Sequence, residues 1–119
     1  MRAKDGVGRY GERVAARRLT ELGMTVLETN WRCAVGEIDI VARDGDCLVV
    51  CEVKTRRSER AGAAVEAVTP AKVRRLRQLT GEWLSAHATS HPALVRLDVV
   101  AVTLSGRGAA RVEHLRGIG

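Results

Sequence analysis

Hydrophobic and polar positions alternate most clearly across residues 36–57, where two runs rich in β-branched residues flank an Asp-Gly-Asp sequence at residues 44–46. This pattern predicts a β-hairpin. Successive side chains of a strand point to opposite faces of the sheet. Ile38 and Ile40 are therefore expected to share an apolar face of the first strand, and the opposite face of each strand carries charged side chains.

The charged faces of the two strands hold three acids and a lysine. Glu37 and Asp39 share a face of the first strand, and Glu52 and Lys54 share a face of the second. If residues 45–46 form the turn, Asp39 lies opposite Glu52. A turn one residue earlier shifts the register by two and places Glu37 there instead. Facing carboxylates destabilise a sheet by up to about 1 kcal/mol, and a divalent cation between them would reverse that sign. The structural alternative is a cross-strand ion-pair patch on an exposed sheet face.

The remaining chain predicts two helices and further strands. Helical periodicity extends from about Lys4 to Leu22, and from a Thr69-Pro70 helix start to about Ala88. Residues Ser58 to Thr69 predict a loop or a short irregular helix. Apolar, β-branched segments predict additional strands over residues 24–32, 94–104 and 109–115. The order helix, three strands, helix, one or two strands is typical of a single α/β domain over residues 1–119, with helices packed on a mixed sheet of about four or five strands.

The first predicted helix has an apolar stripe and a basic side. The stripe consists of Val7, Tyr10, Val14, Leu19 and Leu22. Arginine recurs every fourth residue on the outer side, at Arg9, Arg13 and Arg17. Glu12 lies at the edge of the stripe among small residues, which leave room for the helix to approach the sheet closely. An ordinary ion pair with Arg9 and a functional carboxylate both remain open for Glu12.

Several charged residues of the C-terminal half allow two interpretations. The first half of the second helix carries four cations, although the helix dipole favours acids there. These cations suit either phosphate binding or a solvated face. His87 and His91 would share a helix face, but Pro92 indicates that the helix has ended, so no metal site is expected there. Arg96 and Asp98 share a strand face, and we expect them to pair with neighbouring charges or with those of the hairpin.

Composition limits the class of protein and of partner. The chain of 119 residues has 20 basic and 14 acidic residues, and 17 of the basic residues are arginine. Arginine suits phosphate recognition, so a polyanionic partner and a merely solubilising surface are both consistent with the charge. Three cysteines without a Cys-x-x-Cys pair indicate neither disulfides nor a zinc site. With no signal peptide or membrane span evident, a cytoplasmic location is expected.

The charged hairpin resembles a known nuclease signature. Asp39, followed on the next strand by Glu52-Val53-Lys54, has the form Asp…Glu-x-Lys of the restriction-endonuclease-like, or PD-(D/E)xK, superfamily. The wider pattern is similar to the bacterial YraN-type family, which is related to Holliday-junction resolvases. The resembling segments are Gly11-Glu12 with Ala15-Ala16, residues 30–32, 36–39, 52–56, 66–68 and 96–100. The proline that the superfamily has before its aspartate is absent here, and Gly36-Glu37-Ile38 stands in its place; that position is structural.

The resemblance implies a restriction-endonuclease-like fold and a Mg²⁺- or Mn²⁺-dependent endonuclease that cuts DNA, including branched or junction DNA. Asp39 and Glu52 would bind the metal ion, and Glu12 would complete the carboxylate cluster. Lys54 would orient or activate the attacking water. Glu37 would be either a further acid near the metal or a partner for Lys54 or Arg96.

Four cations near these residues are candidates for phosphate contacts, namely Arg56, Arg57, Lys72 and Arg75. A homodimer would suit a four-way junction, which offers two equivalent cuts. The alternative is a non-catalytic nucleic-acid-binding or adaptor module that retains the nuclease scaffold. A third interpretation is a structural subunit whose basic face meets an acidic protein.

Overall fold

Two helices and five strands make up the computed structural model, which describes residues 6–58, 66, 68–104, 106 and 108–119. The elements are α1 (Gly6–Glu21), β1 (Thr25–Arg32), β2 (Glu37–Asp44), β3 (Cys47–Arg56), α2 (Pro70–Ala86), β4 (Leu94–Thr103) and β5 (Arg111–Leu115). This order confirms the predicted α/β arrangement. Lys4, most of the predicted loop at 58–69 and part of the predicted turn at 105–108 lie outside the described residues.

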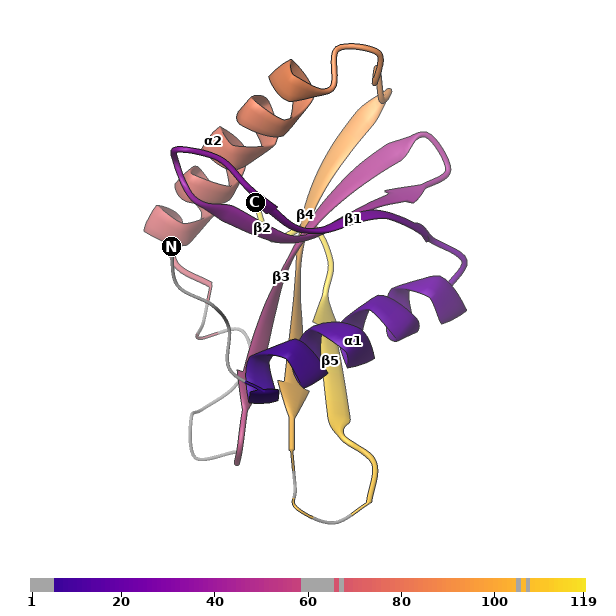
Figure 1. Cartoon of the computed structure of the whole chain (residues 1–119), viewed down its shortest axis with the longest axis vertical. Coiled ribbons are helices and arrows are strands. Elements are labelled where there is room, and N and C mark those ends of the chain that lie inside the picture. The colour runs from indigo at the N-terminus through magenta and orange to yellow at the C-terminus, as the bar shows by residue number, and fades with distance from the viewer. Residues whose placement is uncertain (1–5, 59–65, 67, 105, 107) are drawn as a thin grey trace.

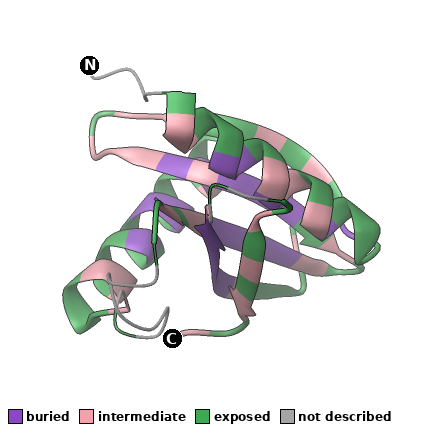
Figure 2. Ribbon diagram, turned by 90° about the horizontal axis from the view of Figure 1, so that it is seen from below, coloured by how far each residue is buried: buried purple, intermediate pink, exposed green. Residues whose placement is uncertain are grey.

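The five strands form one mixed sheet in the order β1-β2-β3-β4-β5. Only β3 and β4 are parallel, because α2 carries the chain back between them, and the other neighbours are antiparallel. The two helices lie on opposite faces of the sheet (Figure 1; Figure 2). No helix in the described ranges is long and apolar enough to cross a membrane.

The hairpin follows the first of the two predicted registers. Asp44 pairs with Cys47, and Ile40 pairs with Cys51. Residues 45–46 therefore form the turn, in which Gly45 takes a φ of +60° that favours glycine. This register brings Asp39 and Glu52 to equivalent positions on the two strands.

The start of α2 also follows the sequence. The Thr69 hydroxyl accepts a hydrogen bond from the Lys72 N–H at 3.1 Å, and Pro70 occupies the first helical turn. The helix ends at Ala86, two residues before the predicted end, where the His87 N–H bonds to the carbonyl oxygens of Trp83 and Leu84. The N-terminal cap at Thr69 fixes where the first turn of α2, with its cations, lies over the sheet.

Each face of the sheet has its own hydrophobic core. Under α1, one buried cluster includes Leu19, Ile40, Val49 and Val100. Cys51 is also buried there, and burial, together with the carboxylates of Asp98, Asp39 and Glu52, raises the pKa of its thiol. Under α2, the buried residues are Ile38, Val41, Leu48, Val50, Leu76, Leu79, Trp83 and Leu97. The sheet is therefore a central layer that is buried on both sides.

The face that α1 turns to the sheet differs from the predicted stripe. Tyr10 and Leu22 are exposed, whereas Gly11, Ala15 and Leu19 are buried. The cause is a close contact with β3, since a Cβ added to Gly11 would lie 1.9 Å from the hydroxyl oxygen of Thr55. Small residues thus set the orientation of α1, and the larger Tyr10 is rotated toward solvent.

The hairpin strands separate at the end that carries the acids. The last pair between β2 and β3 is Ile40 with Cys51. Beyond it, β2 continues along β1 as far as Glu37, and β3 continues along β4 as far as Arg56. Figure 1 shows β1 and β2 running at a steep angle to the far ends of β3 and β4. The expectation that Ile38 and Ile40 share one apolar face is wrong, because the strand turns at this separation and Ile38 joins the core under α2.

We predict opposite effects of alanine at two helical glycines. Gly11→Ala should lower the free energy of unfolding by about 1–3 kcal/mol, because the new methyl group would overlap Thr55. Gly81→Ala on α2 has open space around it and should raise stability by about 0.5–1 kcal/mol. Urea unfolding of both variants measures this, and equal effects would contradict the close contact of α1 with β3.

Candidate active site

Asp39 lies at the point where β2 and β3 separate. The Val53 N–H no longer faces a β2 carbonyl there, and it donates a hydrogen bond to Oδ2 of Asp39 at 2.8 Å. The carboxylate thus replaces the missing ladder bond, which meets the need of a part-buried backbone N–H for an acceptor. This bond orients Asp39 toward β3, one residue beyond Glu52.

Asp39 and Glu52 line the same hollow, of about 460 Å³, between the separated strands and the first turns of α2. Glu37 supplies a third acid to its wall, and Lys72 and Arg75 supply two cations from α2. The structure thus brings together two of the four predicted catalytic residues and two of the four predicted phosphate contacts. Opposite charges meet here at the surface of the core, since Leu76 and Leu79 line the hollow's inner side.

Both cations from α2 are positioned by contacts in this hollow. The Lys72 ammonium lies 2.7 Å from Oε2 of Glu52, and both side chains are about a quarter to a third exposed. The Arg75 guanidinium lies over Gly36, where an added Cβ would come within 2.8 Å of Nη2. The lack of a side chain at Gly36 admits the arginine.

Glu37 has a partner that sequence analysis did not anticipate. Its Oε2 accepts a hydrogen bond from Nε of Arg32 at 3.1 Å. The pair forms because β1 and β2 are in a register that places these two residues opposite each other. The sequence predicts no register between these two strands, so it does not pair Arg32 with Glu37.

The other two predicted catalytic residues lie outside this hollow. Glu12 is on α1, is 6% exposed, and lines a separate shallow hollow with Arg9, Thr29 and Asn30 among others. Its burial confirms the position predicted at the edge of the buried stripe. Lys54 is exposed on β3, two residues beyond Glu52. Their catalytic roles stay predictions.

Arg56 and Arg57 differ in surroundings although they are adjacent. The Arg56 side chain is only 9% exposed; its Nε donates to the Thr103 hydroxyl at 2.9 Å, and Nη2 lies 3.4 Å from the Glu113 carboxylate. These contacts link β3 to β4 and β5 and give Arg56 a structural role. Arg57 follows the strand and is exposed. A phosphate contact is sterically simpler for Arg57, and both assignments remain predictions.

The acids of the hollow suit a hard divalent cation chemically. Asp39 and Glu52 offer oxygen ligands, and Mg²⁺ is commonly held by one or two carboxylates, with water and substrate phosphates filling the other positions. Among the described residues, no group of three or more histidine, cysteine or acidic side chains is arranged to hold an ion. The residues therefore fit a metal site with two protein carboxylates better than a preformed cluster that includes Glu12.

Arg96 and Asp98 form a second charge cluster, on β4. The Arg96 guanidinium binds both Asp98 oxygens at 2.9 and 3.0 Å and reaches Asp44 of the hairpin at 3.3 Å, which confirms the predicted pairing. Nε2 of His114 lies 2.7 Å from Asp98, and the Gly117 N–H donates to the same carboxylate at 3.1 Å.

Asp98 is fully buried, and its charge is stabilised by these partners. Burial by itself would raise the pKa of Asp98, but the hydrogen bonds from Arg96, His114 and Gly117 outweigh it and hold the pKa below its usual value. The cluster links β4 to β5, to the chain after β5 and to the hairpin. It is structural and stands apart from the hollow that contains Asp39.

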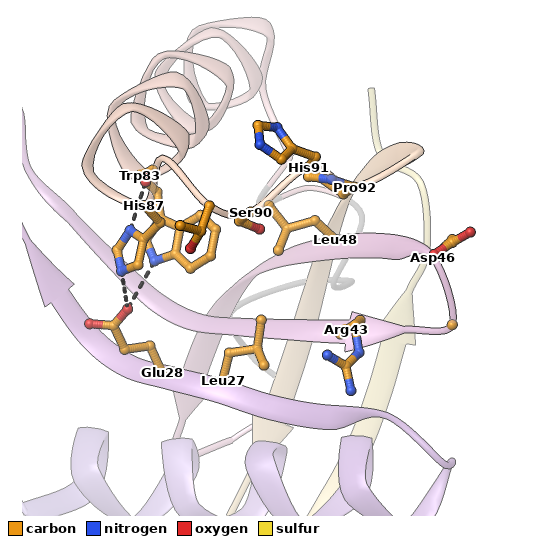
Figure 3. A pocket seen from close by; sticks show the side chains of 12 residues that line it. Leu27, Glu28, Arg43, Asp46, Leu48, Trp83, His87, Ser90, His91 and Pro92 are labelled. Carbon is orange, nitrogen blue, oxygen red and sulfur yellow. Dashed lines mark hydrogen bonds and ion pairs between the residues drawn. The ribbon is translucent and has the colours of Figure 1, made fainter.

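Another hollow, of about 500 Å³, lies between the hairpin and the chain that follows α2 (Figure 3). His87 stacks on Trp83 with ring centroids 3.9 Å apart, and the Glu28 carboxylate accepts a hydrogen bond from the Trp83 indole and lies 3.0 Å from Nε2 of His87. Sequence analysis missed this arrangement, although Trp83 in the last turn of α2 and His87 at its C-cap are four residues apart, which is the spacing of side-chain neighbours.

Comparison with known proteins identifies the family. Residues 11–102 match the family described as "Uncharacterised protein family UPF0102". A UPF0102 protein of Kineococcus radiotolerans is 71% identical over 118 residues, covering 99% of this chain and 97% of its own. The UPF0102 protein SCO5602 of Streptomyces coelicolor is 59% identical, with 99% and 92% covered, and one of Beutenbergia cavernae is 58% identical over the whole of both chains. The chain belongs to this family, which confirms the YraN-type resemblance.

We predict that Asp98 makes stability depend on acid pH. A carboxyl group whose pKa is lower in the folded state contributes stability that is complete above the unfolded pKa of about 3.9 and is lost as pH falls through the folded pKa. Asp98→Asn should cost about 3–5 kcal/mol at pH 7, because Arg96 loses its buried partner. Urea unfolding between pH 7 and pH 3 should show a flatter acid dependence in this variant. The exposed control Asp46→Asn should behave as wild type, and parallel pH profiles for wild type and Asp98→Asn would contradict this role.

Proposed function

We propose that this protein is a Mg²⁺-dependent endonuclease that hydrolyses phosphodiester bonds in DNA, including branched or junction DNA. The observation that carries the proposal is that Asp39 and Glu52 line one hollow at the separation of β2 and β3, with Lys72 and Arg75 on its opposite wall. Carboxylates that hold a metal ion and cations that hold a phosphate are two components that metal-dependent phosphodiester hydrolysis uses.

The proposed metal site would be held by Asp39 and Glu52. A divalent cation bound there would lower the pKa of a coordinated water and offset charge on the phosphate. Asp39 is already oriented by the Val53 N–H, so it would not have to be ordered on binding. Lys54, exposed near the end of β3, would hold or deprotonate the attacking water.

The proposed phosphate site would be supplied by α2. Arg75 offers a planar fork of N–H donors that matches two phosphate oxygens, and it already faces the hollow. Lys72 pairs with Glu52 in this structure, and a phosphate in the hollow would offer it a second acceptor. Arg57 would contact the substrate backbone farther from the hollow.

The second candidate function is a nucleic-acid-binding or adaptor module without turnover. The Lys72–Glu52 ion pair at 2.7 Å favours it, because one of the two proposed metal ligands already has a cationic partner. The absence of a preformed three-ligand cluster among the described residues favours it as well. On this alternative the hollow is a salt-bridged part of the binding surface.

We predict metal-dependent cleavage that requires Asp39. Labelled duplex, flap and four-way-junction DNA would be incubated with the protein in Mg²⁺, Mn²⁺ or EDTA. Wild type should cut with either metal ion and not in EDTA, and Asp39→Asn should be slower by a factor of at least about 100, because it loses a ligand charge while keeping its size. Asp46→Asn, exposed on the hairpin turn, is the matched control and should cut at the wild-type rate.

Retention of DNA binding by Asp39→Asn would show that the loss concerns the chemical step. Salt-sensitive binding by wild type without any metal-dependent product would instead support the binding module. Equal cleavage by wild type and Asp39→Asn would point to a contaminating nuclease and contradict the assignment of this hollow.

We further predict that Lys72 competes with the metal ion for Glu52. Lys72→Gln removes the ion pair and should tighten Mn²⁺ binding about two- to fivefold, the free-energy scale of a part-exposed pair. Titration followed by Mn²⁺ paramagnetic resonance measures this without any substrate. Arg74→Gln, an exposed cation on the same helix, is the control for net charge. The competition would be contradicted if Lys72→Gln bound Mn²⁺ no more tightly than wild type, or no more tightly than the control Arg74→Gln.

A further inference from the structure

The outer side of α1 carries a row of exposed arginines. Arg9, Arg13 and Arg17 are all exposed, as their spacing predicted, and Arg18 lies beside them. The helix has two acids, of which Glu12 is buried against the sheet. We call Arg9, Arg13 and Arg17 the arginine row; the other acid of α1, Glu21, lies at the end of the helix.

The charges of Arg13 and Arg17 are only weakly neutralised. Arg18 and Glu21 approach to 3.9 Å, and both are largely exposed, so this pair contributes little. Within the described residues, Arg13 and Arg17 form no ion pair. Arg13 instead lies over the ring of Tyr10, 5.9 Å from its centroid. These positions on α1 therefore present cationic groups that are available to an anionic partner.

The row borders a concave surface. A hollow of about 550 Å³ lies between α1 and the chain that enters β5. The wall on α1 holds Tyr10, three arginines and one acid, namely Arg13, Arg17, Arg18 and Glu21. The other wall is made of small apolar side chains, Ala109, Ala110 and Val112. Tyr10, the sole tyrosine of the chain, is 42% exposed. The hollow therefore combines arginines, an accessible aromatic ring and an apolar wall.

We propose that the arginine row and its hollow bind a segment of nucleic-acid backbone. Successive arginines are one turn apart, about 6 Å along the helix axis, so they can contact several phosphates of one strand. Arginine is suited to bidentate phosphate contacts, and an exposed tyrosine beside a basic groove can stack on a base or sugar. An acidic protein surface would use the charge but would not need the accessible ring.

The position of this surface identifies the form of the nucleic acid. The arginine row lies on α1, and the hollow with Asp39 and Glu52 lies under α2. The two helices lie on opposite sides of the sheet (Figure 2). A single straight duplex that enters the α2 hollow leaves the arginine row uncontacted. The row therefore binds a second segment that diverges from the first, as the arms of branched DNA do. This inference rests on the proposed function for the first segment only.

The test compares binding of two DNA forms in EDTA, where no cleavage interferes. The variant Arg13→Gln/Arg17→Gln is titrated against a four-way junction and against a duplex of the same arm sequence. Junction affinity should fall about tenfold or more, and its salt slope should fall by about 2, since each lost phosphate contact removes about 0.9 from the slope. Duplex affinity should change less than threefold. Arg43→Gln/Arg116→Gln removes the same charge from exposed positions elsewhere and should keep the junction preference.

The outcomes separate this inference from the proposed nuclease activity. Loss of junction preference in the α1 variant supports the second segment even if wild type cuts no DNA. The inference is overturned if the α1 variant binds the junction as tightly as wild type, or if the charge-matched control loses as much junction affinity as the α1 variant. Either result overturns it even if wild type cleaves junctions well. Retained junction binding together with loss of binding to an acidic polypeptide such as polyglutamate would assign the row to a protein partner instead.

Discussion

The hydrogen bond from the Val53 N–H to Asp39 is the constraint on which the candidate site depends. It forms because the ladder between β2 and β3 ends at Ile40 and Cys51, which leaves a part-buried N–H without a strand partner. A carboxylate that satisfies this N–H is fixed in place, and the same separation opens room for α2 to bring Lys72 and Arg75 close to it. Strand separation, backbone satisfaction and the gathering of charges thus have one origin.

The surrounding fold serves to hold that separation open. On one side, Gly11 lets α1 press against Thr55 of β3, so that strand is supported without β2 beside it. On the other side, Thr69 caps α2 and sets which residues of its first turns face the hollow. The Arg96–Asp98 cluster ties β4 to the hairpin at the opposite end of the sheet.

Local chemistry made much of this structure predictable, and long-range packing decided the rest. The Asp-Gly-Asp turn allowed two registers, and Thr69-Pro70 located α2, because turn and cap residues act through their immediate neighbours. The separation of β2 from β3 could not be predicted, since no turn or helix-breaking residue interrupts either predicted strand at this point. The exposure of Tyr10 and the burial of Arg56 likewise depend on contacts with distant residues, Thr55 beneath α1 and Glu113 on β5. In the site, the motif identified Asp39 and Glu52, whereas the contact of Lys72 with Glu52 arises from helix packing.

The most direct test of the central claim is anomalous diffraction from crystals of the protein equilibrated with Mn²⁺. The account predicts a Mn²⁺ peak between the carboxylates of Asp39 and Glu52, with the Lys72 ammonium displaced from Glu52. A peak at another group of acids, or an unchanged Lys72–Glu52 ion pair at saturating Mn²⁺, would contradict the claim that the separation of β2 and β3 builds a metal site.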